Sequence, residues 1–391
     1  SEPRLSWQME NSEAIRGQRQ TGYHLLVAST RELLEQGEGD LWDSEMVTSS
    51  QSTLVPYAGT PLGSNQTCYW KVRLLDKDGK ETDWSPIAHF SMGLLNSNDW
   101  TGPWIKYPDA EPTQHIWFRK NLNLEEELRT AYIHVASVGY HELYVNGGKV
   151  DSSALGPAMT RLDKRVLYRT YDLAPMLKAG KNTIAIWQGP GWARYSFFKT
   201  EPALRVQLSG TSNTGEPLEL ASDTSWRCRI SSSENIGGIR YRDHGGEKID
   251  ARNHLPDWNQ PGFDDLSWKS AVAAGIRATL SAQMMEATES IETLMAVDID
   301  RENDSYKVDM GRNFSGWISI KLRGLSSGDQ VTAVVADDPE TGQDFGQRSV
   351  YISAGSEEEV FRNRFNYISG RYLTITGLKS APALTDFTGH V

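Results

Sequence analysis

The chain of 391 residues has little cysteine, no long apolar run and a deficit of positive charge. Its two cysteines, Cys68 and Cys228, are too few to build a thiolate metal site alone. We expect both to be buried and unpaired, because they fall in different predicted domains. No apolar stretch approaches the ~18 residues of a membrane span. The net charge of −11, without any basic run, argues against nucleic acid or an anionic membrane as a partner.

Motifs for nucleotides, metals and nucleophilic catalysis are also missing. No Walker loop, G-x-G-x-x-G, H-E-x-x-H, G-x-S-x-G or EF-hand pattern occurs. The eight histidines lack metal-ligand spacing, and we expect packed or surface roles for those in strand-like runs, namely His24, His89, His115 and His134. The opening residues SEPRLSW show no signal-peptide pattern, which leaves the compartment open.

Helix signals are scarce, and two-residue alternation between turn formers is abundant. One short helix is predicted over Thr30–Gly37, with a capping threonine and a closing glycine. Segments such as TGYHLLVAS, AYIHVASV, NTIAIWQG, PALRVQLSG and QVTAVVAD predict strands. Strands at this density predict an all-β fold of antiparallel sandwiches. Thirteen Trp and fifteen Tyr suit β-domain cores, and they would also suit the binding of sugar rings.

Turn-rich joints divide the chain into three blocks, predicted as three consecutive antiparallel β-sandwich domains. The blocks comprise residues 1–93, 94–275 and 276–391. The joints are FSMGLLNSNDWTGPW and WNQPGFDDLSWKSA, both rich in turn formers. No repeat at a fixed period relates the blocks to one another.

The segment VGYHELYVNGGKV, residues 138–150, predicts a β-hairpin. Alternation places Tyr140, Glu142 and Tyr144 on one face and the intervening residues on the other. Asn146-Gly147 suits a two-residue turn that needs positive φ. We interpret this hairpin as scaffold, with function in the loops at the sandwich rim.

Two segments are candidates for contacts with sugars. In QGPGWARYSFF, Trp192 and Tyr195 follow a forced turn at the end of a strand, where they could form a sugar platform or pack at a domain interface. In MTRLDKRVLYRTYDL, Arg161 and Asp163 could bind carbohydrate hydroxyls or belong to a solvated run of charges.

Charged residues are also dense in DHGGEKIDAR, residues 243–252. Glu247 and Asp250 are candidate ligands for a hard cation such as Ca²⁺, and Arg252 is a candidate for binding hydroxyls. The alternative is a network of salt bridges between loops. Paired carboxylates could hydrolyse glycosides. However, Asp337 and Asp338 are adjacent and would point to opposite faces of a strand, so we interpret them as turn residues.

The three blocks, in this order, resemble the N-terminal part of bacterial α-L-rhamnosidases, glycoside hydrolase family 78. The first block, with YWKVRLLDKDGKETDWS, is similar to the family's fibronectin type III-like domain. The second, with ASVGYHELYVNGGKV, DKRVLYRTYDL and GEKIDAR, is similar to its jelly-roll, galactose-binding-like domain, which in some members binds rhamnose through Ca²⁺. The third, with VDMGRNFSGWISIKLRG, is similar to the β-sandwich that precedes the catalytic barrel.

The resemblance implies an enzyme that removes terminal α-L-rhamnosyl residues from plant glycans or glycosides by inversion. Its catalytic carboxylates would lie in an (α/α)₆ barrel beginning near ALTDFTGHV, where this chain stops. We therefore assign no catalytic residue and expect the barrel of the same polypeptide as a partner. A periplasmic or secreted location also follows from the resemblance. One departure is Gly189-Pro190-Gly191-Trp192, in which proline replaces the aspartate found in many members.

Two alternatives remain open from the sequence. The chain could be a standalone protein that binds L-rhamnose or another carbohydrate through its second block. It could instead be a structural or adhesive β-protein that binds a protein partner.

Overall fold

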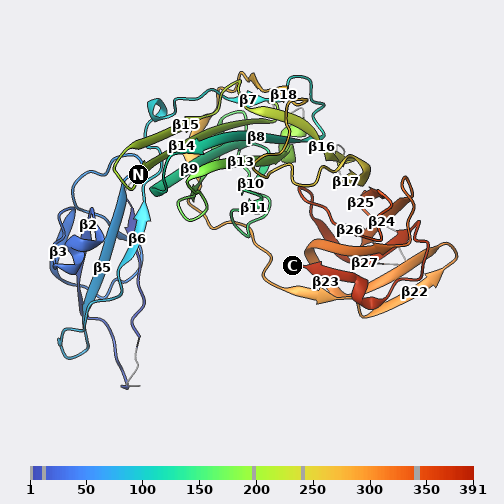
Figure 1. Ribbon diagram of the computed structural model, residues 1–391. Helices are drawn as coiled ribbons and strands as arrows, with labels where there is room; N and C mark the ends of the chain where they lie inside the picture. The colour runs from blue at the N-terminus through green and yellow to red at the C-terminus, as the bar shows by residue number, and fades with distance from the viewer. Residues whose placement is uncertain (1–2, 11–14, 196–199, 239–242, 339–343) are drawn as a thin grey trace. The chain divides into compact units, whose positions relative to one another are not determined.

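The computed structural model describes residues 3–10, 15–195, 200–238, 243–338 and 344–391 (Figure 1). The chain divides into two compact units, residues 1–100 and 101–391. Nearly all of the regular structure is strand, which confirms the predicted all-β class. Among the described residues, no helix has the length and apolar character to cross a membrane. Both cysteines are buried and free, as expected.

The first unit is built around a four-stranded antiparallel sheet with the order β3-β2-β5-β6. The strands are β2 (Gly22–Ala28), β3 (Trp42–Thr48), β5 (Thr67–Leu75) and β6 (Ala88–Ser91), and a small second sheet pairs β1 (Arg4–Leu5) with β4 (Val55–Pro56). A single turn of 3₁₀ helix, η1, spans Ser97–Asp99.

The short helix predicted in this unit is confirmed. Helix α1 spans Arg31–Glu35, and the Thr30 hydroxyl accepts a hydrogen bond from the Leu33 amide at 3.3 Å. Gly37 takes a φ of 85°, the left-handed conformation that commonly ends a helix.

The second block begins the larger unit and consists of two facing sheets. One sheet has the order β19-β7-β14-β9-β12-β20, with β15 beside β14. Figure 1 labels β7, β9, β14 and β15 of this sheet. Its strands are β7 (Ile105–Lys106), β9 (Leu128–Val138), β12 (Arg165–Asp172), β14 (Ala203–Ser212), β15 (Pro217–Ala221), β19 (Val272–Ala273) and β20 (Thr279–Ala282).

The facing sheet has the order β11-β10-β13-β8-β16-β17, with β18 beside β16. Its strands are β8 (Gln114–Leu124), β10 (Tyr140–Val145), β11 (Gly148–Lys149), β13 (Gly180–Gly189), β16 (Arg227–Ile236), β17 (Gly246–Asp250) and β18 (Lys269–Ser270). The main core joins the two sheets and includes Ile133 and Val206 from one and Phe118 and Ile184 from the other. Two 3₁₀ turns, η2 (Gly191–Arg194) and η4 (Ala251–Asn253), follow β13 and β17.

The third block continues the sheet of β17, because β25 pairs with β17 in parallel and extends the order as β25-β24-β27-β23-β28-β21. Its own core includes Val308, Ile320, Leu373 and Phe387. The elements are β21 (Thr293–Met295), β22 (Asp298–Glu302), β23 (Ser305–Arg323), β24 (Gln330–Ala336), β25 (Arg348–Ile352), β26 (Glu358–Phe361), β27 (Ile368–Thr376), η5 (Leu384–Asp386) and β28 (Phe387–His390).

Strand pairing differs from the purely antiparallel expectation at two places. Strand β17 pairs in parallel with β25, and strand β20 pairs in parallel with β12. An isolated antiparallel bridge also joins Ala154 to Thr288. The second block's sheet thus includes residues beyond 275, where the sequence placed the start of the third block. The turn-rich joint at 258–271 is mostly loop, and the chain returns to the second sandwich after it.

The predicted hairpin is formed by β10 and β11. Val145 pairs with Gly148, and Asn146 and Gly147 take φ values of 51° and 88°, as a two-residue turn of this type requires. Leu143 and Val145 enter the main core, so the predicted division of the strand's two faces is confirmed.

A second cluster of aromatic residues covers the opposite face of the sheet containing β8 and β13. Trp117, Trp187, Trp258 and Trp268 pack there, and Phe365 joins them from the segment between β26 and β27 of the third block. Alternation explains the two clusters: Ile184 and Ile186 of β13 face the main core, whereas Ala185 and Trp187 face the tryptophans. Strand β13 is therefore buried on both faces, and Phe365 anchors the third block to the second.

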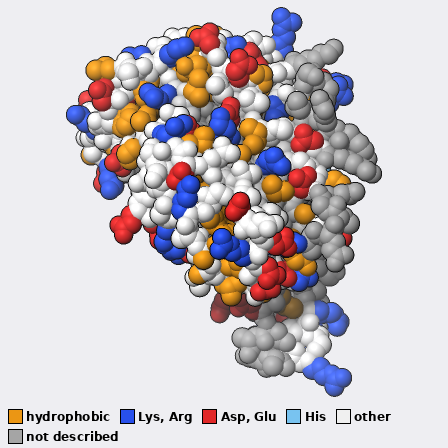
Figure 2. Space-filling model, turned by 90° about the vertical axis from the view of Figure 1, so that its right-hand side faces the viewer, with side chains coloured by type: hydrophobic (Ala, Val, Ile, Leu, Met, Phe, Trp, Pro, Cys, Tyr) orange, Lys and Arg blue, Asp and Glu red, His pale blue; other side chains and the backbone are white. Residues whose placement is uncertain are grey.

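Surface charge is mixed on the face drawn in Figure 2. Lysine and arginine side chains alternate with aspartate and glutamate over the described part of this face. Such a surface does not offer the single-sign field that attracts nucleic acid.

Candidate functional site

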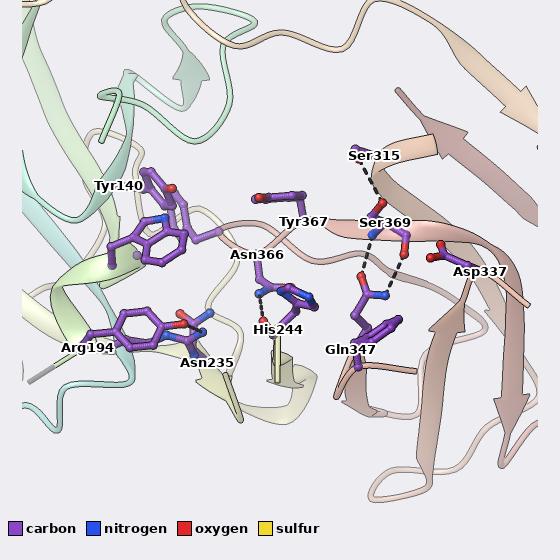
Figure 3. Close-up of a pocket in the computed structure, with 15 residues that line it drawn as sticks. Tyr140, Arg194, Asn235, His244, Ser315, Asp337, Gln347, Asn366, Tyr367 and Ser369 are labelled. Atoms are coloured by element: carbon purple, nitrogen blue, oxygen red, sulfur yellow. Dashed lines mark hydrogen bonds between the residues drawn. The ribbon is translucent and has the colours of Figure 1, made fainter. Parts of the chain in front are cut away.

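A cavity of about 660 Å³ lies between the second and third blocks, beside the Phe365 anchor. Its walls come from segments widely separated in sequence, and Figure 3 shows their side chains converging from both blocks. The lining residues used below are Tyr140, Trp192, Arg194, Tyr195, Asn235, His244, Asp337, Gln347, Asn366, Tyr367 and Ser369.

The second block supplies an aromatic wall. The 3₁₀ turn η2 carries Trp192, and Tyr195 caps it, so their ring centroids lie 5.3 Å apart at an angle of 32°. Gly191 has a φ of 49° and lies against Tyr140, where an added Cβ would come within 3.0 Å of the ring. The Trp192 side chain is 37% exposed. Burial raises the pKa of Tyr140 to about 12, so its hydroxyl stays protonated.

The third block supplies a polar wall with fixed geometry. The buried Gln347 amide donates to the Ser369 carbonyl at 2.7 Å and accepts from the Ser369 amide at 2.6 Å. The Asn366 amide donates to the His244 carbonyl at 3.3 Å, which ties the segment after Phe365 to the loop before β17. These bonds, drawn in Figure 3, hold the wall without occupying Asp337 or Tyr367.

Arg194 is the one cationic side chain among the described lining residues. Its guanidinium donates to the Gly237 carbonyl at 3.0 Å and to the Tyr195 hydroxyl at 3.4 Å, and it lies 5.1 Å from the Tyr195 ring centroid. A guanidinium has five N–H donors, so donors remain for a ligand. The structure therefore brings together an aromatic platform, an arginine and a carboxylate.

Of the residues singled out in the sequence, Trp192 and Tyr195 lie at this cavity. Their sugar-binding role stays a prediction. Arg161 and Asp163 do not line it; instead, they pair with each other through bonds of 2.8 and 3.2 Å, and the Arg161 side chain is 63% exposed. This is the geometry of the solvated alternative, and such pairs contribute little to stability.

The candidate metal ligands have other partners. Glu247 is fully buried, and its carboxylate accepts hydrogen bonds from the amides of Arg364, at 2.8 Å, and Phe365. Asp250 instead pairs with Arg252 through two bonds of 2.8 Å. Three residues apart on β17, the two carboxylates point to opposite faces, so the geometry does not support a shared Ca²⁺ site. No cluster of three or more potential His, Cys, Asp or Glu ligands occurs among the described residues.

The pKa of Glu247 is raised because its carboxylate is buried and, among the described residues, no cation lies at hydrogen-bonding distance from it. Desolvation raises its pKa to about 7, against the opposing effect of the Arg364 and Phe365 amides. Glu247 therefore acts as an internal clamp on the Phe365 segment. This role could not be predicted from the sequence, because its partners are distant along the chain.

Glu142 is a further buried carboxylate, which the sequence placed only in scaffold. It is bonded to Arg364, to Lys149 at 3.0 Å and to the Tyr144 hydroxyl at 2.6 Å. Burial would raise its pKa, but the two cations prevail and lower the pKa to about 2. The Arg364 guanidinium also lies 3.9 Å from the Trp187 ring centroid. The hairpin thus holds the third block in place, and its Tyr140 lines the cavity.

Two of the histidines expected to be packed are indeed buried. His115 bonds to the Asn235 side-chain oxygen at 2.9 Å, and burial lowers its pKa to about 3. His134 bonds to the Thr170 hydroxyl at 2.8 Å, and burial lowers its pKa to about 4. Both are neutral near pH 7 and serve as strand-packing residues.

Several lining residues were missed by the sequence reading. Asp337 was interpreted as a turn residue, yet it borders the cavity directly after β24. Asn366 and Tyr367 carried no signal, because they follow an aromatic anchor whose burial shows only in the fold. The one available clue was the density of polar and aromatic residues in FRNRFNYIS, residues 361–369.

Three family models match the chain in succession. They are described as Rha78A-like, N-terminal immunoglobulin domain, over residues 1–96; Alpha-L-rhamnosidase N-terminal domain, over 126–292; and Bacterial alpha-L-rhamnosidase concanavalin-like domain, over 299–391. Their order is that of the three blocks inferred from the sequence.

Similar proteins agree with these models. An α-L-rhamnosidase of Formosa agariphila is 30% identical over 97% of this chain and 44% of its own length. The solved α-L-rhamnosidase from Dictyoglomus thermophilum has a TM-score of 0.89 and 28% identity, covering all of this chain and 46% of that one. The Streptomyces avermitilis enzyme, solved with L-rhamnose, shares the fold with a TM-score of 0.84 and 21% identity over 55% of its chain.

The chain spans about half the length of the curated relatives it matches. The matches cover all three sandwich blocks, and both the family models and the relatives bear the same description. The chain therefore belongs to the bacterial α-L-rhamnosidase family, within which it corresponds to the N-terminal β-domain region.

Proposed function

We propose that this chain is the accessory region of an enzyme that hydrolyses terminal α-L-rhamnosyl residues from plant glycans or glycosides. The observation that carries the proposal is the succession of three rhamnosidase family models along one chain. The relatives that match are α-L-rhamnosidases about twice as long as the matched part. Neither the standalone binding protein nor the adhesive protein accounts for this succession as well.

Hydrolysis is assigned to the part of the enzyme outside these residues. Inverting glycoside hydrolysis uses two carboxylates roughly 6.5–9.5 Å apart, one as acid and one as base. Asp337 is the only carboxylate among the described residues that line the cavity. Two buried carboxylates of this region, Glu142 and Glu247, are held by Arg364 and by backbone amides. A lone carboxylate cannot fill both catalytic roles.

An exposed apolar surface supports a further domain as the partner. Five large apolar side chains are exposed within fourteen residues of each other, and Ile291 reaches 86% exposure. The Ile291 amide bonds to the Val391 carbonyl at 2.9 Å, so this run of exposed side chains reaches residue 391 at Ile291. We propose that the catalytic domain of the same polypeptide covers it. The five residues are Met284, Met285, Ile291, Met295 and Val297.

The activity is tested with an aryl α-L-rhamnoside. We expect no hydrolysis by the 391-residue chain and hydrolysis by the polypeptide carrying its natural C-terminal continuation. Release of the aryl group by the 391-residue chain alone would overturn the accessory role. Absence of hydrolysis by the continued polypeptide would overturn the enzyme assignment.

The apolar surface is tested by Ile291→Ser in both polypeptides. In the 391-residue chain we expect little change, because the side chain is exposed. In the continued polypeptide we expect a loss of about 1–3 kcal/mol of unfolding free energy, because a buried apolar contact is removed. Leu266→Ser, at 80% exposure elsewhere, is the matched control. Equal, small effects in both polypeptides would contradict the contact.

A periplasmic or secreted location is part of the proposal, since the substrate would be an extracellular glycan. Expression of the native gene followed by cell fractionation tests it. Recovery of the protein in the cytoplasmic fraction would contradict this location.

A further inference from the structure

We propose that the cavity between the second and third blocks is a Ca²⁺-independent binding site for a neutral pyranoside, such as the terminal ring of a glycan. The two blocks form the site jointly, and neither has all of its groups. The inference does not depend on rhamnosidase activity, because binding is measured on this chain alone.

The aromatic side chains favour a sugar ring as the ligand. Among the described residues, Trp192 and Tyr367 are the large aromatic side chains that are exposed, at 37% and 47%, and both border this cavity. They come from different blocks, and Figure 3 shows Tyr367 lying across the cavity from Arg194. Pyranose rings present apolar C–H faces that pack on aromatic planes, while a tyrosine hydroxyl still reaches polar partners.

The polar groups favour hydroxyls as their partners. No hydrogen bond or ion pair joins the Asp337 side chain to another described residue, so its oxygens can accept from hydroxyls. Arg194 uses two of its donors within the protein and retains others. Asn366 is fixed by its bond to the His244 carbonyl and has a second amide hydrogen to donate. An acceptor and two donors around one cavity suit vicinal hydroxyls.

The charges favour a neutral ligand. Among the described residues, the lining contains one arginine and one aspartate, whose charges offset each other, and the neighbouring Glu142 and Arg364 already form an ion pair. Ca²⁺ takes six to eight oxygen ligands, often from several carboxylates, whereas the described lining has a single carboxylate. The cavity volume of about 660 Å³ lies within the roughly 300–1,000 Å³ usual for small-molecule sites.

The aromatic wall is prebuilt, which limits the cost of binding. Packing of Gly191 against Tyr140 fixes the turn η2. The Phe365 anchor and the Glu247 clamp fix the segment that carries Asn366 and Tyr367. A shallow site with few contacts still predicts weak affinity, with a Kd of about 10⁻⁴ M.

The test is calorimetric titration and saturation-transfer NMR of the 391-residue chain with neutral methyl pyranosides. The probes are methyl α-L-rhamnoside, methyl α-D-mannoside, methyl α-D-glucoside and methyl β-D-galactoside, each with Ca²⁺ and with EDTA. Methyl α-D-glucuronide, in which a carboxylate replaces the hydroxymethyl group of the glucoside, tests the preference for neutral sugars. We expect at least one neutral probe to bind equally in EDTA, and its anionic counterpart to bind no better.

Variants locate the site. Trp192→Ala and Tyr367→Ala should each weaken binding at least tenfold, and Asp337→Asn several-fold. All three side chains border open space, so the folding transition should be unchanged. Arg161→Ala is the control, because this charged residue on the same block lies outside the cavity.

Three results would overturn the proposal. One is the absence of binding by every neutral probe at about 10 mM, a hundredfold above the expected Kd. Another is binding that survives in the Trp192→Ala, Tyr367→Ala double variant, which would place the site elsewhere. The third is binding that EDTA abolishes, which would identify a metal-dependent site.

Discussion

Two buried carboxylates contact the same loop from separate strands of one sheet, β10 and β17, and they are stabilised in opposite ways. Glu142 on β10 is bonded to Arg364 and Lys149, and its pKa falls to about 2. Glu247 on β17 accepts bonds from the backbone of Arg364 and Phe365, and its pKa rises to about 7. Backbone dipoles position a segment, but they compensate a buried charge less than a cation does. The difference predicts opposite responses of the two blocks' junction to pH.

The largest effect is expected from Arg364→Ala. This variant leaves Glu142 buried with one cation fewer and removes the packing of the guanidinium on Trp187. Breaking a buried pair costs about 3–5 kcal/mol; with about a third of the Arg364 side chain exposed, we expect about 2–4 kcal/mol. Urea unfolding followed by near-ultraviolet circular dichroism of the tryptophan cluster measures it. A loss below 1 kcal/mol would remove Arg364 from the junction, and Arg161→Ala should stay within about 0.5 kcal/mol.

Glu247 should make the junction weaker as pH rises. Its folded pKa is raised above the unfolded value, so its favourable contribution is complete below about pH 4.5 and is lost as pH rises through about 7. We expect the stability of the natural chain, relative to Glu247→Gln, to fall by up to about 3 kcal/mol over this range. Only the slope is compared, since the glutamine amide also disturbs the two backbone donors. Parallel pH profiles for the two chains would show that Glu247 does not titrate in this way.

Glu142 should give the opposite slope at lower pH. Its folded pKa is depressed, so its contribution is complete above about pH 4.5 and is lost as pH falls toward about 2. Relative to Glu142→Gln, the natural chain should lose about 2–3 kcal/mol over that interval. The two glutamine variants serve as controls for each other, because their profiles should diverge in different pH ranges. An acid slope in the Glu142→Gln variant as steep as in the natural chain would contradict the ion pair.

A smaller effect is expected where the anchor meets β13. A Cβ at Gly189 would lie 2.3 Å from the Phe365 ring, so Gly189→Ala should displace the anchor and cost about 1–3 kcal/mol. Phe365→Leu should lower the stability because the leucine side chain makes a smaller contact, but it leaves room for the methyl group added by Gly189→Ala. The double variant should therefore be more stable than the sum of the single losses predicts. Additive losses would show that the two residues do not constrain each other.

Some structural features of the molecule could be predicted from the local sequence pattern, and others could not. Alternation gave the strands, the turn at Asn146-Gly147 and the division of β10 into two faces, because each depends on neighbours in sequence. Capping chemistry gave helix α1 for the same reason. The pairing of β20 with β12 was missed, since a parallel partner more than a hundred residues away leaves no local signal.

Only some of the residues that line the cavity could be predicted from the sequence. Trp192 and Tyr195 were found because aromatic residues after Gly-Pro-Gly stand out at a strand end. Arg161 looked equally suitable, yet it pairs with Asp163 at the surface. A high density of charged residues in a segment does not show whether those residues bind a ligand or pair with each other. The burial of the side chains and the distances between them do show it.

By itself, the amino-acid sequence determined the all-β class, the order of three sandwich blocks and the turns between strands, since periodicity and turn chemistry act over a few residues. Tertiary structure alone decided that Phe365 and Arg364 join the third block to the second. It also decided that residues from 140 to 369 surround one cavity. Side chains so far apart in sequence meet only after both sheets have formed, because the packing of whole faces, and not local preference, sets which of them become neighbours.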